Sequence, residues 1–247
     1  SGSSFTSTAT NPMAFDTGAG LSVDGVTYSF PVGGVSMVVG VDTDISASFS
    51  GACSYSAFTD YMGDCGTGNT LGKGGNGLTA TGSYAFDSGL SIAAGISATA
   101  DGASQAANKV GIMTTEGADS FGLNVAYATD SWGLAAAYIH DDGAAEDGTS
   151  SWGINGTYIF DESNLPTLSA GYETQATAGT DTSGYFFGLT WPEVGPGSVS
   201  VGAATKGNFA DTATEYMIYE ASYSYPVNDG LTVTPGVFIE ETAGDDL

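Results

Sequence analysis

Apolar and small polar residues alternate along residues 214–239, and this pattern restricts what the segment can fold into. Every second position is apolar on both sides of a turn at 226–230: Met217, Tyr219, Ala221, Tyr223, Tyr225, Leu231, Val233, Pro235, Val237 and Ile239. Successive side chains of a strand point to opposite faces, so the pattern predicts a hairpin with one apolar face and one polar face. Each arm has roughly 10 residues, the length that a tilted strand needs to cross a bilayer. The alternative is a hairpin of a soluble β-sandwich.

The same alternation recurs from residue 77 onward, and about twelve strands are expected in the whole chain. The connections are sorted by length. Short ones lie near 31–34, 87–88, 130–131, 161–165, 192–196 and 226–230, and longer ones at 42–76, 101–118, 141–150, 175–183 and 206–213. A sandwich has no reason to sort its connections, whereas an outer-membrane barrel has short turns at one end and long loops at the other. The predicted fold class is all-β, an antiparallel up-and-down transmembrane β-barrel.

Aromatic residues cluster near the expected strand ends, where a girdle at the membrane surface needs them. They include Tyr127, Trp132, Tyr138, Trp152, Phe160, Tyr185 and Trp191. The period of two then assigns side chains to faces. We expect these residues to face lipid: Leu123, Val125, Tyr127, Leu134, Tyr138, Leu168, Leu189, Val201, Tyr223 and Val233. We expect these to face the lumen: Asn124, Asn155, Thr157, Glu173, Thr190, Glu220 and Thr232.

The charge balance excludes several classes of partner. Lysine and arginine together number 3, all of them lysines, against 28 aspartates and glutamates, which gives a net charge of −25. Binding to nucleic acid requires cations that neutralise phosphates, so no nucleic-acid partner is expected. A basic patch for anionic lipid is excluded for the same reason. No run of about 18 apolar residues, the length of a membrane-spanning helix, occurs in the chain.

Four segments, in order along the chain, resemble segments of cyanobacterial outer-membrane porins. They are residues 27–33 (TYSFPVG), 165–172 (LPTLSAGY), 186–191 (FFGLTW) and the closing hairpin. The sequence is therefore similar to the carbohydrate-selective porin superfamily, in the branch often labelled iron-uptake porins. This resemblance implies a porin β-barrel domain over residues 1–247, in contact with lipid of the outer membrane of a Gram-negative, cyanobacterial cell. It does not identify the solute, because no substrate residue of the family is matched.

Members of this family usually carry an N-terminal S-layer-homology domain that binds peptidoglycan-linked polymer, and they close on a strand that ends in Phe. This chain begins with a Ser-rich segment and stops at Asp245-Asp246-Leu247. We therefore expect a piece of a barrel of roughly sixteen strands, a size within the range of outer-membrane barrels. We also expect attachment to peptidoglycan through a domain outside this sequence, and a homo-oligomer, with a trimer favoured.

Acidic residues concentrate in the longer loops and at strand ends, and they predict a pore that prefers cations. The expected acidic mouth consists of Asp60, Asp64, Asp141, Asp142, Glu146 and Asp147, and Glu240 joins Glu173 and Glu220 as a lumen acid. A mouth of one sign concentrates counter-ions. The predicted function is passive diffusion of small hydrophilic solutes and inorganic cations. The alternative is an acidic secreted surface or matrix β-protein that assembles with itself, with or without calcium; only the barrel would need detergent to stay dispersed.

Cys53 and Cys65 are the only cysteines, and both fall in the longest loop. An even pair in a polar loop predicts a disulfide and an oxidising compartment, and two free thiols are the alternative. Because this loop is the longest, we expect it to fold inward and narrow the pore. No cysteine or histidine partner lies nearby, so zinc is not expected.

Three weaker signals carry no enzymatic prediction. His140 lies beside Asp141 and Asp142 without a Ser or Cys signature, so it is read as a residue of the rim and not as a catalytic base. Residues 72–77 match G-x-G-x-x-G, but no buried parallel strand precedes them and no helix follows, so a flexible loop is expected. The acids at 141, 142, 146 and 147 could bind Ca²⁺, but a solvated acidic loop is favoured. We expect no cofactor and no metal.

Overall fold

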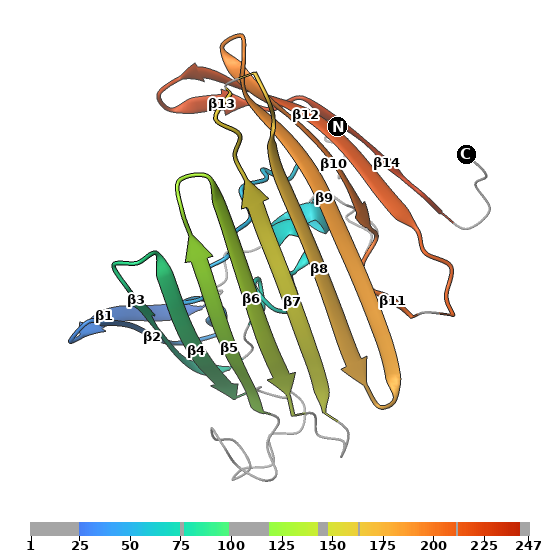
Figure 1. Ribbon diagram of the computed structural model, residues 1–247. Coiled ribbons are helices and arrows are strands. Elements are labelled where there is room, and N and C mark those ends of the chain that lie inside the picture. The colour runs from blue at the N-terminus through green and yellow to red at the C-terminus, as the bar shows by residue number, and fades with distance from the viewer. Residues whose placement is uncertain are drawn as a thin grey trace, which may run out of the picture.

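The computed structural model describes residues 25–74, 77–98, 119–142, 148–162, 164–210 and 212–242, and these form one antiparallel sheet (Figure 1). Each strand pairs with the next one along the chain. The strands are β1 (Val26–Val32), β2 (Val35–Val41), β3 (Leu78–Ala85), β4 (Leu90–Ala98), β5 (Asp119–Ala128), β6 (Trp132–Asp141), β7 (Thr149–Tyr158), β8 (Thr167–Thr177), β9 (Thr180–Val194), β10 (Gly197–Thr205), β11 (Phe209–Ala210), β12 (Met217–Asn228), β13 (Leu231–Val233) and β14 (Gly236–Glu240). A short 3₁₀ segment, η1 (Asp60–Gly66), lies between β2 and β3.

These fourteen strands make twelve passes of the chain, as the alternation predicts. β11 has two residues and pairs with β9 beside the main path. β13 and β14 are two parts of one arm, and both pair with β12. The interruption falls at Thr234-Pro235, because proline has no N–H to donate to a ladder. The Pro235 carbonyl still accepts from the Tyr223 N–H at 2.9 Å, which keeps the arm in register.

The prediction of a longer loop at 175–183 is wrong. β8 continues to Thr177 and β9 begins at Thr180, so only Ala178 and Gly179 connect them. Both residues have positive φ, 48° and 80°, which is the backbone of the two-residue turn that matches strand twist. The flanking residues are small and polar and therefore resemble a loop in sequence, yet they pair as strands. The strict alternation of short and long connections fails at this hairpin.

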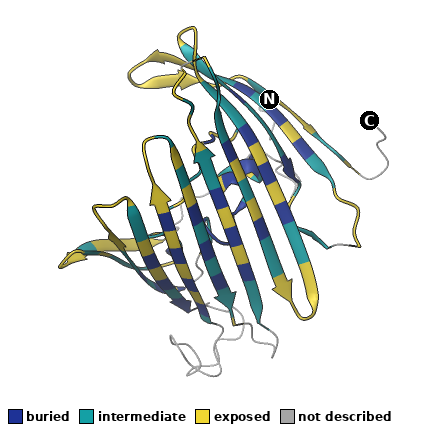
Figure 2. Cartoon of the chain, viewed as in Figure 1, coloured by how far each residue is buried: buried dark blue, intermediate teal, exposed yellow. Residues whose placement is uncertain are grey.

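The two faces of the sheet differ in exposure, which appears as bands along strands β4 to β9 (Figure 2). On β5, the side chains of Leu123 and Val125 are 55% and 46% exposed, whereas Asn124 between them is 5% exposed. All ten residues expected to face lipid are exposed or half-buried, and none is buried in a closed protein core. No second layer of the described residues covers this apolar face. The β-sandwich alternative is therefore wrong.

Aromatic side chains form two rows on the outer face of β5, β6 and β7. One row contains Tyr127, Trp132 and Tyr158, and the other contains Phe121, Tyr138 and Trp152. Within each strand the two members are six positions apart (121 and 127, 132 and 138, 152 and 158), which is roughly 20 Å along a strand. The rows hold ring contacts, with centroids 5.3 Å apart for Tyr127–Trp132 and 4.5 Å for Tyr138–Trp152. Aromatic rows on both sides of an apolar band are typical of outer-membrane barrels.

The sheet is curved and open (Figure 1). Among the described residues, β1 pairs only with β2, and the β13–β14 arm pairs only with β12. Both edges therefore present unpaired backbone groups. No helix in the described part of the chain is long and apolar enough to cross a membrane.

Candidate pore constriction on the concave face

The described part of the connection between β2 and β3, residues 42–74 and 77, folds inward and crosses the concave face of the sheet (Figure 1). Its first pass meets glycines on five strands: Ile45 at Gly95 on β4, Phe49 at Gly122 on β5, Tyr55 at Gly188 on β9 and Gly202 on β10, and Phe58 at Gly236 on β14. The order of these contacts follows the order of the strands. We call residues 42–74 and 77 the crossing loop. Its inward fold is the one expected from its length.

Inward-facing amides and hydroxyls of the strands hold the first pass. Asn124 on β5 accepts the Ser50 N–H at 2.8 Å and donates to the Ser50 carbonyl at 3.2 Å. Asn155 on β7 accepts the Ala52 N–H at 2.8 Å. These bonds replace the β-ladder partners that the loop backbone lacks, which buried backbone groups require.

The first pass ends on a buried carboxylate. Glu220, on β12, is 4% exposed and accepts four hydrogen bonds from the crossing loop. Its Oε1 accepts the Tyr55 hydroxyl at 3.0 Å and the Phe58 N–H at 2.7 Å. Its Oε2 accepts the N–H and the hydroxyl of Thr59, each at 2.7 Å. Burial, and secondly the charge of Glu220, raise the pKa of Tyr55, so this phenol keeps its proton.

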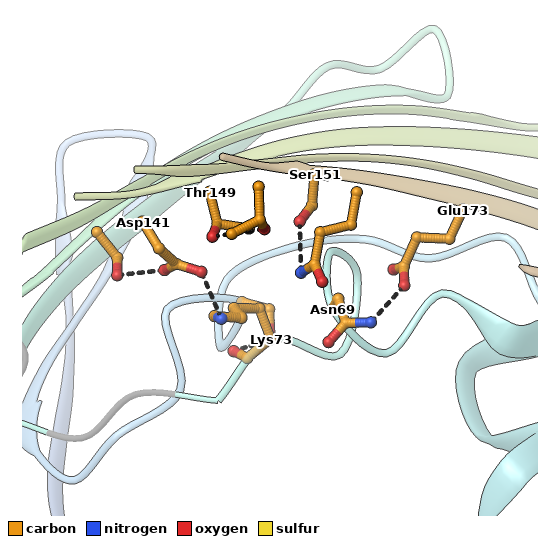
Figure 3. Close-up of polar contacts among 10 residues, drawn as sticks. Asn69, Lys73, Asp141, Thr149, Ser151 and Glu173 are labelled. Carbon is orange, nitrogen blue, oxygen red and sulfur yellow. Dashed lines mark hydrogen bonds and ion pairs between the residues drawn. The ribbon is translucent and has the colours of Figure 1, made fainter. Parts of the chain in front are cut away.

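The return pass is held by two further carboxylates, which lie under the arch of the strands (Figure 3). Glu173 on β8 is 1% exposed and accepts from Asn69 at 2.7 Å and from Thr70 at 2.9 Å. Asp141 on β6 accepts the Lys73 ammonium at 2.7 Å and the Ser120 hydroxyl. The loop is therefore tied to β6, β8 and β12 through charge-assisted bonds, which are stronger than neutral ones.

Cys53 and Cys65 form a disulfide that joins the two passes, with their Cα atoms 5.9 Å apart. The turn at Cys65 is left-handed over three residues: Asp64, Cys65 and Gly66 have φ of 50°, 52° and 68°. Left-handed backbone is unfavourable for residues other than glycine and persists only where the surroundings fix it. Here Gly171 of β8 lies against the Cys65 carbonyl, and the Asp64 carbonyl accepts from Asn155 at 3.3 Å.

The inward glycines are the functional residues that sequence reasoning missed. A Cβ on Gly153 would collide with Thr70, and one on Gly202 would lie 2.7 Å from the Tyr55 hydroxyl. The loop backbone approaches these strands closely because the positions carry no side chain. Their recurrence at inward positions of neighbouring strands was the available signal.

The structure places the predicted lumen residues as follows. Asn124, Asn155, Thr157, Glu173 and Glu220 bond the crossing loop, with Ser54 and Thr157 hydroxyls 2.6 Å apart. Thr190 shares a hydrogen bond of 3.1 Å with Ser200 of β10. Thr232 is exposed on β13, opposite Pro226. Glu240 forms an ion pair with Lys206, and its hydrogen bond raises the pKa of that lysine.

The predicted acidic mouth is only partly a set of free charges. Asp60 and Asp64 are exposed on the crossing loop, and Asp142 is exposed beside β6. Asp141 is paired with Lys73. Glu146 and Asp147 lie outside the described residues. Two loop acids not assigned to the mouth, Asp42 and Asp44, are also exposed.

His140 lies on the outer face of β6, near the aromatic row. Its Nδ1 is 2.9 Å from the Ser150 hydroxyl, and its ring centroid is 5.4 Å from that of Phe121. Within the described ranges, no three His, Cys, Asp or Glu side chains gather where they could hold a metal ion. Of the glycine motif at 72–77, residues 75 and 76 lie outside the described residues, and the remainder belongs to the return pass.

Solved structures with a similar arrangement are porins. A porin refined at 1.8 Å resolution aligns with a TM-score of 0.57 at 14% identity, covering 89% of this chain and 77% of that one. Two engineered variants of Rhodopseudomonas blastica porin align with TM-scores of 0.53 at 17% identity, covering 91% and 90% of this chain and 75% and 74% of theirs. No protein-family model and no curated protein matches the sequence. The chain has the porin-type β-barrel fold. At identities this low, the likeness speaks for the fold alone.

Proposed function

We propose that the protein is an outer-membrane porin that lets small hydrophilic solutes and inorganic cations diffuse passively. One observation carries the proposal: a loop tied by buried carboxylates crosses the concave face of a sheet whose other face is apolar. An apolar outer face with aromatic rows suits lipid. A polar inner face narrowed by a fixed loop suits a pore. Nothing in this arrangement requires a catalytic group, so we propose a channel and not an enzyme.

The exposed acids of the crossing loop support a preference for cations. Asp42, Asp44, Asp60 and Asp64 are exposed, whereas the one lysine of this loop is neutralised by Asp141. A constriction with net negative charge attracts cations and repels anions. The effect decays over a Debye length of about 8 Å at physiological ionic strength, so the preference is modest in a wide pore.

The alternative, an acidic secreted β-protein that assembles with itself, fits the outer face less well. Side chains such as Trp152 and Leu123, 59% and 55% exposed, would stand in water. Soluble proteins rarely expose an apolar surface of that extent. The need for detergent separates the two functions: the porin precipitates without it, and the secreted protein stays dispersed.

The finer assignments rest on the resemblance of four segments to cyanobacterial porins. On that basis we propose a cyanobacterial outer membrane, a trimer, and attachment to peptidoglycan through a domain outside this sequence. Open edges on both sides of the sheet support further strands in the complete pore, because unpaired backbone groups in hydrocarbon cost several kcal/mol each.

Solute entry into liposomes tests the proposed function. Full-length protein reconstituted into lipid vesicles is exposed to neutral sugars of increasing size, and swelling is followed by light scattering. A porin admits the small sugars and excludes the larger ones. Vesicles that admit none of them, although they contain folded protein, would contradict the proposal.

A further inference from the structure

We propose that Glu220 is a positioning residue that holds the crossing loop across the pore, and that it contributes little as a free lumen charge. This deepens the proposed function and rests on it for its consequence in conduction. A sequence reading counts Glu220 among the lumen acids. The structure instead buries its carboxylate beneath the loop, at 4% exposure.

The bonding of this carboxylate is complete and comes from one short segment. Both oxygens accept two donors each, all four from residues 55–59. A buried carboxylate needs several hydrogen bonds to remain in place, and here the loop supplies them. The bonds also serve the loop. The backbone N–H groups of Phe58 and Thr59 have no partner in a β-ladder, and Glu220 is their acceptor.

These bonds lie at the far end of the first pass, so they fix the position of the residues that follow. Residues 55–59 form the far end of the first pass, opposite the β2 end from which the loop enters. Asp60 begins η1 directly after Thr59, so the location of this exposed acid depends on the bonds to Glu220. Glu173, on β8, holds the return pass in a similar way, but through side chains of Asn69 and Thr70.

The side-chain amide of glutamine cannot replace this carboxylate. In Glu220→Gln one oxygen becomes an NH₂ group, which is a donor and would face donors of the loop. The hydroxyl on that side, of Tyr55 or Thr59, can turn and accept from the NH₂ group, but the backbone N–H of Phe58 or Thr59 cannot, so at least one buried N–H group remains unsatisfied. The end of the loop then detaches from β12. Glu240→Gln is the matched control, because it removes the same charge from the neighbouring β14 while its partner is Lys206 and not the crossing loop.

Hydrogen exchange tests whether Glu220 holds the crossing loop, and it does not require a conducting pore. Amide exchange of the peptide that contains Phe58 and Thr59 is measured by mass spectrometry in the folded, reconstituted full-length protein. Heat-modified mobility on gels verifies that each variant is a folded barrel. We expect these amides to lose protection in Glu220→Gln and to remain protected in Glu240→Gln and the wild type. Unchanged protection in Glu220→Gln would overturn the inference, whether or not the protein conducts.

Single-channel recording tests the consequence. If Glu220 holds the constriction, Glu220→Gln raises conductance and loses part of the cation preference, whereas Glu240→Gln shows no rise in conductance. Equal behaviour of the two variants would mean that only the lost charge matters, and the inference would fail. If the wild type does not conduct while Glu220→Gln alone loses amide protection, the positioning role of Glu220 is supported and the proposed porin function is contradicted.

Discussion

At the scale of single residues, the close approach of the loop to inward glycines determines whether the constriction can form. Gly171→Ala places a methyl group against the Cys65 carbonyl, well inside contact distance. We expect the free energy of unfolding to fall by about 1–3 kcal/mol, as for overpacked sites. Gly63→Ala is the control, since nothing lies within 4 Å of its added Cβ. Urea titration of both variants in detergent measures the effect, and equal midpoints would contradict the predicted close contact.

Tyr55 gives the loop a dependence on alkaline pH. Its pKa is raised in the folded protein, first by burial and then by the charge of Glu220. A raised pKa means that the folded state holds the proton more tightly. The hydrogen bond from Tyr55 to Glu220 therefore contributes fully to the free energy of unfolding below about pH 10, the pKa of an unfolded tyrosine. Above that pH the contribution declines. The free energy of unfolding, measured between about pH 8 and 11, should fall more steeply for the wild type than for Tyr55→Phe. Parallel curves of free energy against pH would refute this role of Tyr55.

At the scale of elements, the disulfide links the two passes of the crossing loop. The cysteines are separated by 12 positions, and closing a loop of this size stabilises by roughly 3 kcal/mol in the chain-entropy model. Intact mass after iodoacetamide treatment should show no adduct in untreated, denatured protein and two adducts after reduction. Two adducts without reductant would show free thiols.

The elements also show which features a sequence can predict. The strand positions and faces followed from the period of two, because one face is apolar and exposed and the other meets polar groups. The β8–β9 hairpin was missed because residues 175–183 are small or polar on both faces, so no alternation marks them as strands. Turn chemistry at Ala178-Gly179 was the remaining signal.

At the scale of the whole molecule, the path of the crossing loop could not be predicted from the sequence. Its anchors lie far away along the chain: Glu220 and Tyr55 are 165 positions apart. No local pattern in the sequence predicts a contact between residues so far apart in the chain. Length alone predicted that the loop folds inward, and the period of two placed Asn124, Asn155 and Glu220 on the inner face. That these residues bind the loop follows only from the folded sheet.

Ion selectivity tests the central claim, a pore narrowed by an acidic loop. Reversal potentials are recorded across a KCl gradient in planar bilayers that contain the full-length protein, at several mean salt concentrations. We predict K⁺ over Cl⁻, with a preference that weakens as salt rises because screening shortens the reach of the acids. Asp60→Asn with Asp64→Asn should reduce the preference while conductance persists. An anion preference, or no conductance at all, would contradict the account.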